Sequence, residues 1–87
     1  MIKKPITIQL SDGLEARPIA LLVQEASQYS STIHIEVDNK KVNAKSIMGM
    51  MSLKVSQGEQ ITLVASGTDE EEAAKGIERF LINVKDK

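Results

Sequence analysis

The chain has 87 residues, a formal net charge of -1 and no cysteine. This length suits one small core, so we expect a single domain over residues 1–87. The balanced charge provides no basic block for direct nucleic-acid binding, and the lack of cysteine excludes disulfides, thiol chemistry and thiolate metal sites. No apolar run approaches the roughly 20 residues that cross a membrane, and no signal-peptide core is visible. We therefore expect a soluble cytoplasmic protein with no membrane partner.

The first half of the chain switches between strand and helix periodicity. Residues 6–11, ITIQLS, have apolar side chains at every second position, which predicts a half-buried strand, and Pro5 fits its start or a sheet edge. Residues 17–28 have apolar side chains three and four positions apart, which predicts an amphipathic helix. Residues 32–37, TIHIEV, alternate again, and DNKK at 38–41 predicts a turn to another short strand.

The second half predicts a short helix, a strand and a longer helix. The segment SIMGMMSL, 46–53, predicts a short helix capped by Ser46, and QITLVAS, 60–66, alternates as a strand. Thr68 and Glu71 have the spacing of a capping box at the start of the last helix. The apolar stripe expected on that helix consists of Ala73, Ile77, Phe80, Leu81 and Val84.

The predicted element order is β-α-β-β-α-β-α, and every strand has one apolar and one polar face. Strands with a polar face are typical of antiparallel or mixed sheets that are exposed to water on one side. We therefore predict an α+β fold in which all helices pack on the apolar face of one sheet.

Residues that commonly carry out chemistry are scarce. The single histidine, His34, lies two residues from Glu36 on the expected polar face of a strand, and two ligands rarely form a metal site. One exposed histidine cannot be assigned to a Ser/His/Asp triad, and no glycine-rich phosphate loop is present. The sequence therefore predicts a solvated His34, no metal, no cofactor and no enzyme activity.

The stretch DGLEARPIALL, residues 12–22, has the composition of a site at the start of a helix. The expected helix lacks a good N-cap because Ala16 has no side-chain acceptor, so its first N–H groups and Arg17 together could bind an anion. Alternatively, Glu15 satisfies those N–H groups itself as a local cap. The residues alone leave both interpretations open.

A second candidate site lies in VNAKSIMGMMSLKV, residues 42–55. Ile47, Met48 and Met51 share one side of the short helix through their spacing, whereas Leu53 is expected in the core. Clustered methionines either fill a core or form an adaptable binding surface, and the spacing allows both.

Two motifs and the element order resemble the HPr family, the small phosphocarriers of the bacterial sugar phosphotransferase system. GLEARPIA resembles the family's active loop, which reads glycine, an aliphatic residue, histidine, alanine, arginine and proline. AKSIMGMMSL resembles the family's regulatory serine segment in its Gram-positive form. The resemblance covers the whole chain and implies an open-faced β-sandwich, with a four-stranded antiparallel sheet under three helices.

One position departs from the HPr pattern, because Glu15 stands where the family has its phosphoryl-accepting histidine. In the family, that imidazole takes a phosphoryl group from enzyme I and passes it to sugar permeases. A carboxylate is a weak nucleophile and repels phosphate, and no metal or base is visible to assist it. Family members without the histidine resemble Crh, the catabolite-repression branch, which typically carries glutamine there, so Glu15 departs from both patterns.

The resemblance implies a regulatory role centred on Ser46. HPr kinase/phosphorylase would phosphorylate Ser46 with ATP, and the product would act as corepressor of CcpA, a LacI-type transcription regulator, in carbon catabolite repression. The expected partner-binding residues are Arg17, Ile47, Met48 and Met51. The alternative function is that of a phosphocarrier in the phosphoenolpyruvate-dependent sugar phosphotransferase system. We expect a monomer or a weak dimer, with Gly13 as a hinge if the first strand is exchanged.

Overall fold

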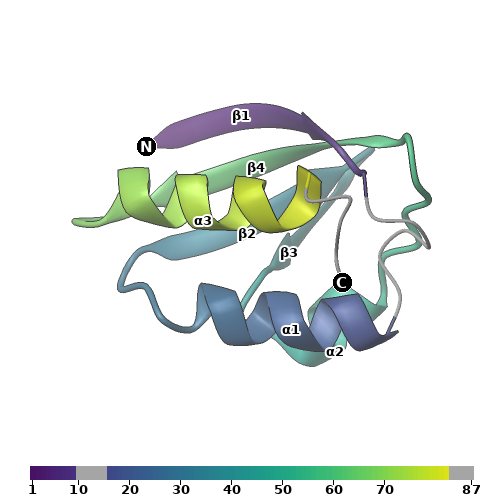
Figure 1. Cartoon of the computed structure of the whole chain (residues 1–87), viewed down its shortest axis with the longest axis horizontal. Helices are drawn as coiled ribbons and strands as arrows, with labels where there is room; N and C mark the ends of the chain where they lie inside the picture. The colour runs from purple at the N-terminus through teal and green to yellow at the C-terminus, as the bar shows by residue number, and fades with distance from the viewer. Residues whose placement is uncertain (10–15, 83–87) are drawn as a thin grey trace.

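The computed structural model describes residues 1–9 and 16–82 (Figure 1). Within these residues, strands and helices follow one another in the predicted order. Their bounds are β1 Ile2–Thr7, α1 Ala16–Ala26, β2 Thr32–Val37, β3 Lys40–Asn43, α2 Ile47–Met51, β4 Gln60–Ser66 and α3 Glu70–Ile82. The expected strand residues Leu10 and Ser11 and the expected helix residue Val84 lie outside the described residues.

The four strands form one antiparallel sheet in the order β1-β4-β2-β3. The three helices lie on one face of the sheet, with α3 packed along β1 and β4 and with α1 packed beside α2 (Figure 1). This arrangement confirms the predicted α+β fold and the open-faced sandwich that the resemblance implied.

β1 begins at Ile2 instead of at Ile6, where the alternation of apolar residues starts. Lys3 and Lys4 interrupt that alternation, but they still pair with β4 in the antiparallel register. An edge strand pairs on one side only, so it tolerates polar side chains and also Pro5 in its middle. The predicted edge position of Pro5 is confirmed.

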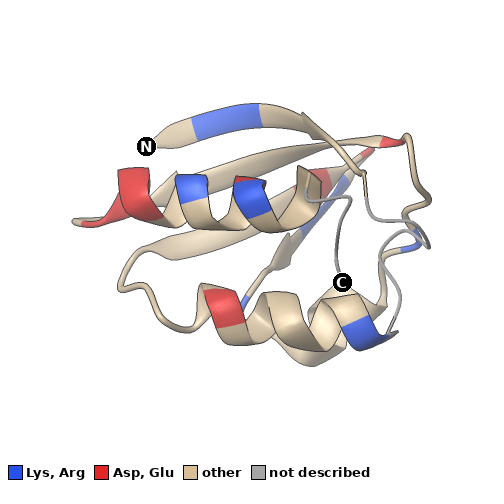
Figure 2. Ribbon diagram, viewed as in Figure 1, with Lys and Arg blue, Asp and Glu red and all other residues tan. Residues whose placement is uncertain are grey.

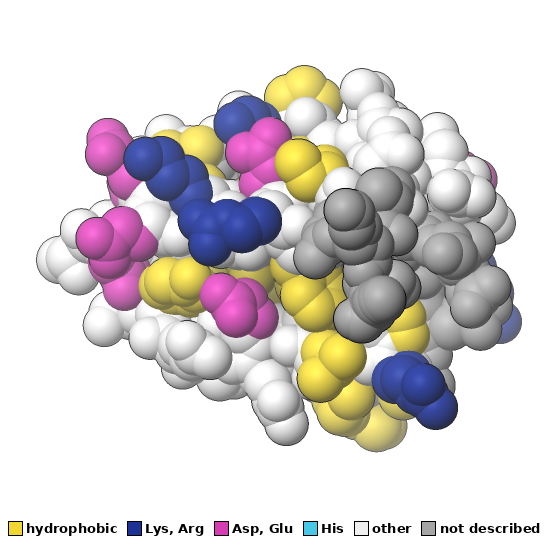
Figure 3. All heavy atoms as spheres, viewed as in Figure 1, with side chains coloured by type: hydrophobic (Ala, Val, Ile, Leu, Met, Phe, Trp, Pro, Cys, Tyr) yellow, Lys and Arg dark blue, Asp and Glu magenta, His cyan; other side chains and the backbone are white. Residues whose placement is uncertain are grey.

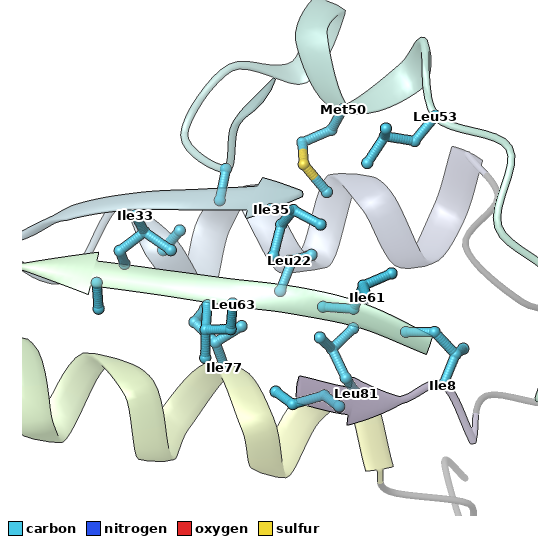
Figure 4. Close-up of a cluster of buried hydrophobic side chains, with 14 of the residues drawn as sticks. Ile8, Leu22, Ile33, Ile35, Met50, Leu53, Ile61, Leu63, Ile77 and Leu81 are labelled. Carbon is cyan, nitrogen blue, oxygen red and sulfur yellow. The ribbon is translucent and has the colours of Figure 1, made fainter. Parts of the chain in front are cut away.

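The core lies between the sheet and the helices (Figure 4). Ile61, Leu63 and Ala65 of β4 alternate onto the buried face, where Leu63 lies opposite Ile35 of β2. Burial of a large aliphatic side chain contributes about 1.5–3 kcal/mol, so these contacts supply the main stabilisation of the fold. The large apolar side chains with less than 2% exposure are Ile8, Leu22, Ile33, Ile35, Met50, Ile61, Leu63, Ile77 and Leu81.

Side chains on the open face of the sheet are less exposed to solvent than the alternation of apolar and polar residues along the strands predicted. Val64 lies on this face, yet its side chain is only 4% exposed. Its cross-strand neighbours are Lys3 of β1 and His34 of β2, and His34 is itself half-buried. His34, which the sequence predicted to be solvated, lies on the open face as expected but is partly shielded, because neighbouring side chains in one cross-strand row cover one another.

The start of α3 is capped differently from the prediction. The backbone N–H of Gly67 donates a hydrogen bond of 3.1 Å to Glu70 Oε1, and this bond is the main cause of the lowered pKa of Glu70. The expected capping box of Thr68 and Glu71 was wrong, because the helix begins at Glu70 and the preceding residue is Asp69.

Asp69 ties the start of α3 to the loop between α1 and β2. Its carboxylate accepts hydrogen bonds from the backbone N–H groups of Ser30 and Ser31, both at 2.9 Å, and from the Ser31 hydroxyl at 2.5 Å. These bonds, the one from the Ser31 hydroxyl above all, lower the pKa of Asp69. Gly67 permits this close approach, because a Cβ there would lie 2.6 Å from Ser31 Cα.

Replacing Asp69 with asparagine should lower the melting temperature at neutral pH, because the amide has one acceptor oxygen instead of two. The folded-state pKa of Asp69 lies below the ordinary value of 3.8. The ionised carboxylate therefore stabilises the fold above about pH 4, and this effect is lost as the pH falls through the folded-state pKa. Melting temperatures of the wild type and Asp69→Asn, measured from about pH 7 to about pH 2, should converge at low pH.

Glu71→Gln is the matched control, since it removes an exposed carboxylate from the same helix turn. This control should change the melting temperature little. A constant difference between Asp69→Asn and the wild type over the whole pH range would contradict the role of the ionised carboxylate.

Candidate functional site

Ser46 forms the N-cap of α2, as its place before the short helix predicted. Its backbone is extended, with φ of -108° and ψ of 115°, and its carbonyl oxygen accepts the N–H of Met50 at 2.9 Å. Its Oγ accepts the backbone N–H of Gly49 at 3.2 Å. The side chain is half-buried, so the hydroxyl is held at the head of the helix while the residue keeps contact with solvent.

The turn that precedes Ser46 is anchored to two other parts of the chain. The Ser46 N–H donates to the carbonyl oxygen of Asn43 at 3.0 Å, and the Lys45 N–H donates to Asn43 Oδ1 at 2.8 Å. Lys45 Nζ donates to the carbonyl oxygen of Tyr29 at 2.7 Å, in the loop between α1 and β2. The position of Ser46 thus depends on the end of β3 and on a loop distant in sequence.

α2 has one buried and one exposed side. Met50 is fully buried and Leu53, just beyond the helix, is 4% exposed, and both point into the core (Figure 4). Ile47, Met48 and Met51 are 45%, 80% and 52% exposed. These three residues, called the α2 patch below, lie on the surface, and Leu53 lies in the core as expected.

Leu21 of α1 is a further exposed apolar residue that the sequence analysis missed. Its side chain is 49% exposed, and α1 packs against α2. Figure 3 shows hydrophobic side chains gathered over the surface formed by these two helices. The sequence could have predicted this exposure, because Leu21 does not share the helical face of Ile19, Leu22 and Ala26, which are all buried.

Arg17 lies in the first turn of α1, and its side chain is exposed. Figure 2 shows basic colouring at the start of α1, the helix that contacts α2. Glu15 lies outside the described residues. The two alternatives for the segment around Glu15, an anion site or a local helix cap, therefore stay predictions.

The described residues contain no group of three histidine, cysteine or acidic side chains that could hold a metal ion. His34 and Glu36 share the open face of β2, because Ile33 and Ile35 face the core. None of the described helices is both long and apolar enough to span a bilayer.

Comparison with known protein families adds an independent observation to this geometry. A family model described as the PTS HPr component phosphorylation site matches residues 2–83. This chain belongs to the HPr family. The match confirms the resemblance noted in the sequence, and it covers both the Ser46 segment and the sequence segment that contains Glu15.

The relatives of this HPr-family chain include both HPr and Crh. HPr-like protein Crh from Halalkalibacterium halodurans is 52% identical over 81 residues, which are 93% of this chain and 96% of the relative. HPr-C-His from Thermoanaerobacter tengcongensis is 57% identical, with a TM-score of 0.88 over 93% of this chain and 91% of that chain. Crh from Bacillus subtilis, whose crystal structure is described as a swapped dimer, is 48% identical, with a TM-score of 0.78 over 97% of both chains. The sequence identity of this chain to HPr proteins is thus similar to its identity to Crh proteins. Individual positions, not overall identity, therefore have to distinguish the two kinds of protein.

The two sides of α2 should respond differently to truncation. Met48→Ala should change the free energy of unfolding by less than about 0.5 kcal/mol, because the side chain is exposed. Met50→Ala should lower it by about 2–5 kcal/mol, because it leaves a cavity in the core. Urea denaturation of the two variants measures both values, and similar losses for both would contradict the exposed position of Met48.

Proposed function

We propose that this HPr-family chain is a Crh-type regulator of carbon catabolite repression. HPr kinase/phosphorylase phosphorylates Ser46 with ATP, and the phosphorylated chain acts in the cytoplasm as corepressor of CcpA, a LacI-type transcription regulator. The observation that carries this proposal is the Ser46 hydroxyl at the head of α2, adjacent to the exposed α2 patch. The similarity to Crh from Halalkalibacterium halodurans supports it.

The Ser46 site suits a modification that changes the surface and leaves the fold intact. Ser46 Oγ attacks the γ-phosphorus of ATP, ADP leaves, and the hydroxyl proton passes to a base of the kinase. The phosphate adds about -1.5 to -2 charges and three strong acceptor oxygens. Because Oγ already accepts the Gly49 N–H and the preceding turn is anchored through Asn43, the new group joins a preformed N-cap.

The α2 patch offers a partner an apolar surface beside the phosphate. Methionine side chains are flexible and polarizable, which allows one surface to fit two partners, here the kinase and the regulator. Arg17, exposed on α1, provides a cation that can pair with the phosphate or orient it toward a basic pocket of the regulator. Leu21 adds apolar area on the same helix.

A phosphocarrier in the phosphoenolpyruvate-dependent sugar phosphotransferase system is the second candidate. The family model and the 57% identity to HPr-C-His favour it. Against it, Glu15 replaces the family's phosphoryl-accepting histidine. The chain's one histidine, His34, lies within β2 between Asn43 and Val64 of the adjacent strands, neither of which is a cation. Because phosphoryl transfer needs an anion-stabilising site, we favour the regulator, which is not an enzyme.

A weak dimer formed by strand exchange belongs to the same proposal. Both edge strands carry lysines, which disfavour pairing with the edge of a second copy (Figure 2). Exchange of β1 between two copies, with Gly13 as the hinge, avoids this repulsion because β1 keeps a β4 partner. The swapped dimer described for Crh from Bacillus subtilis supports this route.

Phosphorylation of Ser46 should raise the affinity for CcpA at least about tenfold, which corresponds to about 1.4 kcal/mol, because a charge-assisted arginine–phosphate pair becomes possible. Calorimetric titration of CcpA with unmodified and kinase-treated protein measures this change. Equal affinity of the two forms would refute the proposed switch.

Three variants test whether the gain in affinity in the calorimetric titration depends on Ser46 and on the α2 patch. Ser46→Ala should fold normally and show no gain after kinase treatment. Ser52→Ala, at the other end of α2, should behave like the wild type, because its hydroxyl donates locally to the Gly49 carbonyl oxygen at 2.6 Å. Met48→Ala should accept phosphate but bind CcpA more weakly, since it truncates the α2 patch.

Glu15 should keep the chain out of the sugar relay. Incubation with enzyme I and labelled phosphoenolpyruvate should leave the wild type unlabelled, because a carboxylate repels the incoming phosphoryl group. Glu15→His should accept label at least in part, and Glu15→Gln should not. Label on the wild-type chain would favour the phosphocarrier function instead.

A further inference from the structure

Gly49 lies within α2, a five-residue helix. Glycine is a poor residue for a helix interior, because it loses more backbone freedom on folding than alanine does. A glycine at such a position calls for a reason other than helix formation.

The fold itself has room for a side chain at position 49. A Cβ built on Gly49 would lie 3.4 Å from Ser46 Oγ, 3.6 Å from Ser46 Cβ and 3.7 Å from Val42 Cβ. All three distances are ordinary van der Waals contacts, so alanine would fit without moving the backbone. The atom nearest to the added methyl group is the hydroxyl oxygen of Ser46, the atom that the proposed function requires to react.

We propose that Gly49 is a positioning residue that keeps Ser46 Oγ open to an incoming phosphoryl group. This inference rests on the proposed phosphorylation of Ser46. The Gly49 N–H donates to Oγ at 3.2 Å, so one side of the oxygen is already taken by the backbone. A methyl group at 3.4 Å would cover a further part of the same oxygen.

The transfer step makes this space necessary. As Ser46 Oγ forms a bond to the γ-phosphorus of ATP, the bond from that phosphorus to the oxygen of ADP breaks, and the hydroxyl proton leaves to a base of the kinase. The phosphorus carries three further oxygens, so the group that approaches Oγ is far larger than the hydrogen that departs. Gly49 lets the phosphoryl group reach Oγ while the Gly49 N–H bond holds that oxygen in place.

The test compares two glycine-to-alanine variants with opposite expectations. Gly49→Ala should be phosphorylated by HPr kinase/phosphorylase and labelled ATP at least about tenfold more slowly than the wild type, which corresponds to about 1.4 kcal/mol in the barrier. Its melting temperature should be unchanged or higher, because alanine favours the helix. Gly58→Ala should have a lower melting temperature and an unchanged rate, because Gly58 has φ of 90° and a Cβ there would have no neighbour within 4 Å.

The loss in Gly49→Ala should appear in kcat and leave KM for the protein substrate nearly unchanged, since the exposed α2 patch that binds the kinase is intact. Equal rates for Gly49→Ala and the wild type would refute the role of Gly49 while leaving the proposed function standing. A large fall in the melting temperature of Gly49→Ala would also refute it, because Gly49 would then serve the fold. A wild-type chain that accepts no label from ATP would refute the proposed function itself.

Discussion

β4 is paired with β1 along one edge and with β2 along the other, so it lies inside the sheet. Its inward side chains, Ile61, Leu63 and Ala65, are at most 1% exposed. A slip of one residue along either neighbour would turn the apolar set of that strand toward the open face, and the register is therefore strongly specified. The helices cover this same face: α3 packs along β1 and β4, α1 packs beside α2, and α2 also contacts β3.

The hydroxyl of Ser46 is fixed by contacts that follow from this packing. Asp69 at the start of α3 accepts hydrogen bonds from Ser30 and Ser31 and so holds the loop after α1. In the same loop, the Tyr29 carbonyl oxygen accepts a hydrogen bond from the ammonium group of Lys45. Segments far apart in the sequence thus converge on the turn that carries Ser46. The geometry of this surface is therefore set by the packed chain itself, and in the proposed function it exists before a partner arrives.

α2 combines this fixed hydroxyl with two different faces. Met50 anchors the helix in the core, whereas Met48 projects into solvent, so the helix is held firmly while its outer face stays adaptable. The same short segment therefore provides both a core anchor and an exposed apolar surface. In the proposed function, the segment around Ser46 keeps the regulatory role, while the segment around Glu15 lacks the family's nucleophilic histidine. The chain would then take part in regulation and not in sugar transport.

The sequence by itself determined the element order, the α+β class, the Ser46 cap and the family, because periodicity, capping and short motifs are local properties of the chain. Tertiary structure decided the rest. Val64 is buried on the open face because of its cross-strand neighbours, and β1 extends to Ile2 because pairing with β4 outweighs its polar residues. The contact of Asp69 with Ser31 was not predicted at all, since Ser31 lies far away along the chain. Such contacts join residues that no spacing rule connects, so only the packed chain reveals them.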